Sequence, residues 1–125
     1  MGEYYMNEKQ MLLFQNLKNI KDYWTTTAVD SLNPNPDISP FENEDDYKIL
    51  QTKLSSQEEI NAYRKIQNEV IQGVIHSILV MIDGGDDLAD NYLVDLVDRD
   101  TKESLLKEVA LHEEFVGYLL DNEEE

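Results

Sequence analysis

Residues 57–82, QEEINAYRKIQNEVIQGVIHSILVMI, contain the strongest structural signal in this chain. Their apolar side chains recur at steps of three and four residues, which is the spacing of one face of an α-helix. We therefore expect a helix of 26 residues, about 39 Å long at a rise of 1.5 Å per residue. The apolar positions are Ile60, Tyr63, Ile66, Val70, Ile71, Val74, Ile75, Ile78, Leu79 and Ile82.

The second half of this stretch has a competing interpretation. Residues 74–82 are rich in β-branched side chains, which also suit a buried strand. The helical spacing continues without a break from the polar first half and favours the helix. Because Val80 and Met81 lie off the main stripe, this half is apolar on nearly all sides, and we expect it to be buried among several elements.

Helix signals flank the long stretch on both sides. At its start, Ser55 or Ser56 precedes Glu58 or Glu59 by three residues, the spacing of a capping box. At its end, Gly84 and Gly85 should stop the helix, because glycine adopts the left-handed cap conformation without steric cost.

Three other segments have helical patterns, so about four helices are expected, arranged around the long one at 57–82. One begins near Asn7, which forms a possible capping box with Gln10. Another begins with Ser39 as its N-cap and Pro40 as its first residue, after a proline-containing loop at 28–38. The apolar face of the first helix is Leu13, Phe14, Leu17, Ile20 and Trp24, and that of the C-terminal helix is Leu111, Phe115, Val116, Leu119 and Leu120.

The region before the C-terminal helix has strand character. Residues 92–97 form a short apolar run broken only by Asp95, residues 98–101 have turn composition, and residues 103–106 can return as a second strand. We therefore predict a small β-hairpin at 91–106 and a mostly helical α+β fold. Because a lone hairpin is marginally stable in water, it should lie on the helices or pair with another chain.

Length and composition place this fold in one domain. The chain has 125 residues, of which 41% are hydrophobic, so we expect a single domain over residues 1–125 with frayed ends at 1–6 and 122–125. It contains no cysteine, which excludes disulfides and cysteine-ligated metals. The longest apolar run, residues 78–82, is too short to span a bilayer, and the N-terminus is acidic and polar. These features indicate a cytoplasmic protein.

The charge is strongly negative and unevenly distributed. The chain carries 27 acidic and 10 basic residues, a formal net charge of −17, and 15 of the acids lie in residues 83–125. Such a charge repels nucleic acid and anionic membrane and attracts cationic surfaces. We therefore expect the partner to be a basic protein surface. The predicted partner-binding residues are Asp86, Asp87, Asp90, Asp95, Asp98, Asp100 and Trp24. Trp24 favours core packing at the end of the first helix's apolar face, and a partner anchor is its alternative role, because tryptophan often anchors interfaces.

Metal and catalytic sites are the alternatives to a partner-binding surface. EF-hand registers that start at Asp83 or Asp98 lack the required glycine at position 6 and glutamate at position 12. Glu108 and His112, four residues apart, are expected to share a helix face and are the weak metal candidates, whereas His76 suits a core or interface position. Signatures of nucleophilic catalysis or phosphate binding are missing from the sequence. No cofactor is therefore expected.

The sequence favours a non-enzymatic, acidic protein-interaction module, with an inhibitor or immunity-type protein as its concrete form. The alternative is a small metal-binding protein or hydrolase that uses the carboxylates of residues 83–90 or the Glu108–His112 pair. A homodimer built by the hairpin edge or the long helix is a third hypothesis.

Overall fold

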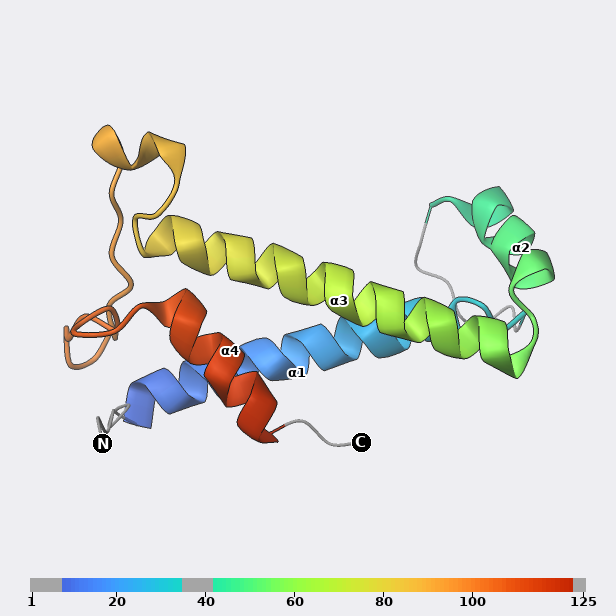
Figure 1. The fold of residues 1–125 in the computed structure, drawn as a ribbon, viewed down its shortest axis with the longest axis horizontal. Helices are drawn as coiled ribbons and strands as arrows, with labels where there is room; N and C mark the ends of the chain where they lie inside the picture. The colour runs from blue at the N-terminus through green and yellow to red at the C-terminus, as the bar shows by residue number, and fades with distance from the viewer. Residues whose placement is uncertain (1–7, 35–41, 123–125) are drawn as a thin grey trace. The chain divides into compact units, whose positions relative to one another are not determined.

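The computed structural model describes residues 8–34 and 42–122 (Figure 1). In these ranges the chain forms four α-helices and one short 3-10 helix. They are α1 (Glu8–Asp30), α2 (Glu44–Lys53), α3 (Gln57–Ile82), η2 (Asp87–Asp90) and α4 (Leu111–Asn122). Ser39 and Pro40, the predicted start of the second helix, lie outside the described residues, and α2 itself begins at Glu44.

The chain divides into two compact units. The terminal unit comprises residues 1–18 and 73–125, and the middle unit comprises residues 19–72. Helices α1 and α3 each contribute residues to both units. A single domain over 1–125 stays a prediction. The predicted fraying at 1–6 and 123–125 lies outside the described residues, whereas Asn122 is the last residue of α4 and its side chain donates a hydrogen bond to the Tyr118 carbonyl.

Both ends of α3 follow local sequence signals, and the helix predicted at 57–82 is confirmed. At the start, the Glu59 N–H donates to Ser56 Oγ at 3.1 Å, and the Ser56 N–H donates to Glu59 Oε1 at 3.0 Å. Hydrogen bonds from the backbone of Ser56 and Ser55 lower the pKa of Glu59. At the other end, Gly84 has a φ of 80°, and the Gly85 N–H donates to the Val80 carbonyl, which closes a Schellman motif.

The second half of α3 is not buried on all sides, which corrects that expectation. Of the α3 residues, only Ile75 and Leu79 are buried, while Val74 and Ile78 remain about half exposed. An all-round apolar helix is covered only when it has neighbours on every side. In the described part of the terminal unit, α4 and the start of α1 are the other α-helices.

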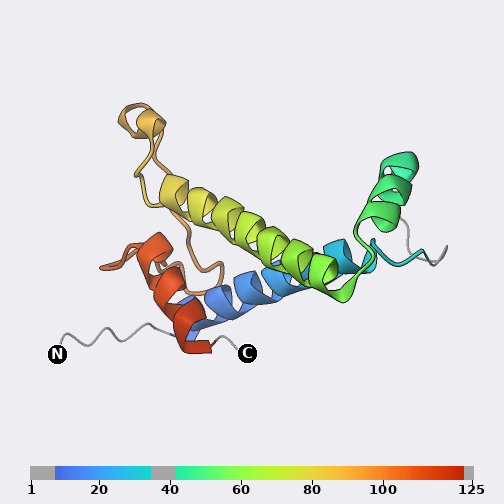
Figure 2. The same ribbon diagram turned by 45° about the vertical axis from the view of Figure 1, so that its right-hand side comes forward.

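The core of the terminal unit is an aromatic cluster between α1 and α4. The Phe14 ring centroid lies 5.6 Å from that of Phe115 and 5.9 Å from that of Tyr118. Leu111 and Leu119 are buried on the same helix as Phe115. Helix α4 therefore crosses the beginning of α1 in both views (Figures 1 and 2).

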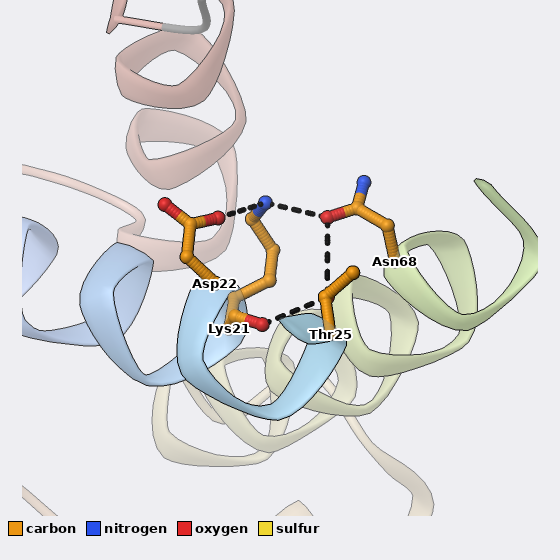
Figure 3. A network of polar contacts seen from close by, with 4 residues as sticks. All are labelled: Lys21, Asp22, Thr25 and Asn68. Atoms are coloured by element: carbon orange, nitrogen blue, oxygen red, sulfur yellow. Dashed lines mark hydrogen bonds and ion pairs between the residues drawn. The ribbon is translucent and has the colours of Figure 1, made fainter. Parts of the chain in front are cut away.

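The middle unit is joined by a polar network around a buried lysine (Figure 3). The Lys21 side chain is 2% exposed. Its Nζ donates to Asn68 Oδ1 of α3 at 2.8 Å and to Asp22 Oδ1 at 3.0 Å. Thr25 Oγ1 donates to the Lys21 carbonyl at 2.8 Å. Because a buried cation is stable only with partners, this network determines how α1 and α3 face each other within the unit.

The predicted β-hairpin at 91–106 is wrong, and so is the α+β class. The described residues contain no strand, only one isolated antiparallel bridge between Val97 and Ser104. Side-chain oxygens accept hydrogen bonds from backbone N–H groups that would otherwise be available for pairing between two strands. Asp95 Oδ1 accepts from the Leu96 N–H and from Ser104 Oγ, and Ser104 Oγ accepts from the Leu106 N–H.

Candidate functional site

The predicted partner-binding aspartates lie on one surface segment of the terminal unit. Residues 86–100 run from the cap of η2 through a non-helical stretch into the turn at 98–101 (Figure 1). The segment contains six aspartates and one arginine. All of these charged residues are exposed except Asp98, which is half-buried. The segment therefore presents a concentrated negative surface.

Three of the six aspartates stabilise the local fold. Asp86 Oδ1 accepts from the Leu88 N–H and caps η2. Asp95 Oδ1 accepts from Ser104 Oγ at 2.6 Å, and Asp98 Oδ2 accepts from the Thr101 N–H at 2.8 Å. Asp98 also pairs with Lys9 Nζ at 3.3 Å. These carboxylates hold the segment in shape.

Asp98 should titrate below its ordinary pKa of 3.8, mainly because the Thr101 N–H stabilises the carboxylate and secondarily because of Lys9. The contribution of the Asp98 carboxylate to folding stability is present at pH values above its pKa in the unfolded chain. It is lost as the pH falls through its lower pKa in the folded protein. In Lys9→Gln the pKa of Asp98 should rise only part of the way to 3.8, since the larger cause remains. A carboxyl-carbon NMR titration of both proteins measures this, and full return to 3.8 would contradict it.

The other three aspartates have open carboxylates. Within the described ranges, no hydrogen bond or ion pair involves the side chains of Asp87, Asp90 and Asp100, and all three are exposed. Large apolar side chains stand among them: Leu88 is 61% exposed, Tyr92 57%, Leu93 72% and Val97 45%. We call residues 86–100 the acidic–apolar segment. Its apolar side chains are not among the site residues that the sequence predicts, because a short apolar run favours a strand.

Trp24, the seventh predicted residue, belongs to the middle unit. It is 45% exposed, and its ring meets that of Tyr23 edge to face at 5.3 Å. Its place on the predicted apolar face of α1 does not bury it. Trp24 therefore lies on α1, outside residues 86–100.

His112 is held by Asp83, a contact that the sequence did not indicate. Asp83 Oδ2 lies 2.6 Å from His112 Nδ1 and accepts from the His112 N–H, while Oδ1 accepts from the Leu111 N–H at 3.0 Å. The His76 ring meets that of His112 edge to face at 5.4 Å. Asp83, just after α3, is thus the N-terminal cap of α4 from 28 residues away.

The expected pairing of Glu108 with His112 on one helix face is wrong. Helix α4 begins at Leu111, and Glu108 precedes it with a φ of 63°. Among the described residues, no three or more histidine, aspartate or glutamate side chains are grouped so that they could hold a metal ion. Asp83 uses its two oxygens for the cap and for His112.

In comparisons with known proteins, no family model, no curated protein and no solved structure matches this chain. Among the described helices, none combines the length and the apolar character that crossing a membrane requires. Any assignment of function therefore rests on the acidic–apolar segment itself.

Proposed function

We propose that the protein is a protein-interaction module that binds a basic partner through the acidic–apolar segment. The supporting observation is that three open carboxylates and four exposed large apolar side chains occur together within residues 86–100. Interfaces combine apolar anchors with a polar rim. Tyr92, Leu88 and Leu93 are the anchors in this proposal, and Asp87, Asp90 and Asp100 form the rim.

The charge determines the class of partner. A net charge of −17 accelerates encounter with a cationic surface and opposes encounter with nucleic acid. The concrete form of the proposal is an inhibitor or immunity-type protein that covers the basic functional surface of another protein in the cytoplasm. No catalytic step is proposed.

The test starts from a partner captured from native lysate and then purified. We expect Asp87→Asn, Asp90→Asn and Asp100→Asn together to weaken its binding at least about tenfold, through the rim charges. Raising salt from about 50 to about 500 mM should weaken binding to the unmodified protein and have a smaller effect on the triple variant. Isothermal titration calorimetry measures both effects.

A matched control replaces Glu44, Asp45 and Asp46 by asparagine, three acids at the start of α2 in the middle unit. This variant changes the net charge by the same amount and should bind within about twofold of the parent, since long-range steering alone acts weakly at physiological salt. Equal losses in the two triple variants, or no loss in either, would refute binding through the acidic–apolar segment.

A further inference from the structure

Four consecutive residues of the acidic–apolar segment have unpaired backbone groups. In the described part of the chain, no hydrogen bond involves the backbone N–H or C=O of Tyr92, Leu93, Val94 or Asp95. Each residue carries one donor and one acceptor. The stretch runs as an open chain from η2 to the Val97–Ser104 bridge (Figure 1). Its backbone is therefore available to another chain.

The side chains of this stretch suit a β-strand. Tyr92 and Val94 belong to the aromatic and β-branched types that favour strands. The bridge shows that the chain reaches strand geometry at Val97, where the Leu105 N–H donates to the Leu96 carbonyl at 2.7 Å. A strand added next to residues 92–95 would extend a pairing that this chain begins and does not complete.

We propose that residues 92–95 bind the partner by β-strand addition, with an extended, Lys- and Arg-bearing segment of the partner protein as the occupant. This inference rests on the proposed function and specifies how the acidic–apolar segment works. Backbone hydrogen bonds supply affinity in this mode, and side chains on alternate positions supply specificity.

Charge selects a basic segment over a second copy of this chain. Pairing residues 92–95 of two copies would bring together two segments with six aspartates and one arginine each. Like charges on directly opposed strands destabilise a pair, whereas opposite charges stabilise it. Asp90 lies two residues before the unpaired stretch, and its open carboxylate would face the partner's cations.

The probe is an acetylated and amidated peptide, Lys-Thr-Val-Lys-Val-Thr-Arg. Its matched control is the same peptide with N-methyl groups on all of its residues' amides, which keeps the charge and removes the donors of both edges. Both are titrated into the intact isotope-labelled protein and followed by amide NMR and hydrogen exchange. We expect the methylated peptide to bind at least about tenfold more weakly, because it loses several hydrogen bonds. We also expect exchange to slow at alternate amides of residues 92–95 only with the unmodified peptide.

The Asp87, Asp90 and Asp100 triple variant separates charge from backbone pairing. It should weaken the binding of both peptides by a similar factor. The ratio of their two affinities should stay unchanged, since the effects of charge and of backbone pairing are independent. Equal affinity of the two peptides for residues 86–100 would overturn strand addition while leaving the proposed function standing. If exchange at residues 92–95 slows with rising protein concentration in the absence of peptide, a second copy of the chain binds there. That result would overturn the proposal that a basic segment of another protein is the occupant. If neither peptide perturbs residues 86–100 at about 1 mM, both proposals fail.

Discussion

Replacing Phe14 by alanine should lower the free energy of unfolding by about 3–5 kcal/mol. Phe14 is fully buried, and its ring contacts those of Phe115 and Tyr118. The substitution removes the aromatic group that connects α1 to α4 and leaves a cavity that the surrounding helices fill only partly. Chemical denaturation followed by circular dichroism measures the loss.

Tyr23→Ala is the matched control for Phe14→Ala, since Tyr23 is an aromatic residue of the same helix. Tyr23 is 62% exposed and contacts Trp24. Its replacement should cost no more than about 1 kcal/mol. Equal losses for the two variants would show that the aromatic cluster between α1 and α4 is not the core of the terminal unit.

Asp83→Ala should cost about 2–4 kcal/mol, because it removes the acceptor for two backbone N–H groups at the start of α4 together with the partner of His112. The Asp83 side chain is only 8% exposed, so water replaces these bonds poorly. The largest increase in amide exchange should appear in the first turn of α4. Denaturation and hydrogen exchange together measure both effects.

Two variants sharpen the Asp83 experiment. Asp83→Asn keeps one acceptor oxygen and should lose less stability than Asp83→Ala. Glu113→Gln changes an exposed carboxylate whose Oε2 lies 3.9 Å from His112 Nε2 and should change stability by less than about 0.5 kcal/mol. A loss for Glu113→Gln as large as that for Asp83→Ala would mean that general charge, and not the cap, stabilises α4.

The ends of α3 were predictable because short-range chemistry determines them. Ser56 and Glu59 form their capping box within four residues of chain, and Gly84 adopts the left-handed conformation that ends the helix. Such signals depend only on neighbouring residues. The cap of α4 was not predictable, because its acceptor, Asp83, is distant in sequence and becomes a cap only after folding.

The orientation of α1 was predicted incorrectly in part, for a different reason. Apolar spacing placed Ile20 and Trp24 on the buried face, yet both are more than 40% exposed, and Lys21 and Thr25 are buried instead. The buried polar groups are satisfied by partners such as Asn68 on α3. A hydrophobic pattern cannot reveal partners that lie on another helix, so it assigned the wrong side of α1 from Ile20 onward.

The negative charge of the candidate site was predictable from the sequence. Its backbone structure, and which of its carboxylates are engaged in local bonds, were not. Clustered aspartates are visible in the sequence, and the structure separates Asp86, Asp95 and Asp98, which bond the local backbone or side chains, from the three with open carboxylates. The apolar run at 92–97 favoured a paired strand. Because Asp95 and Ser104 divert the hydrogen bonds that a ladder needs, the run remains exposed and unpaired over 92–95.

Hydrogen–deuterium exchange of the intact protein, alone and saturated with its purified captured partner, shows directly whether residues 86–100 are the binding surface. Partner binding should slow exchange most strongly within residues 86–100, with weaker changes elsewhere. Protection centred on residues 19–30 around Trp24, with residues 86–100 unchanged, would contradict it.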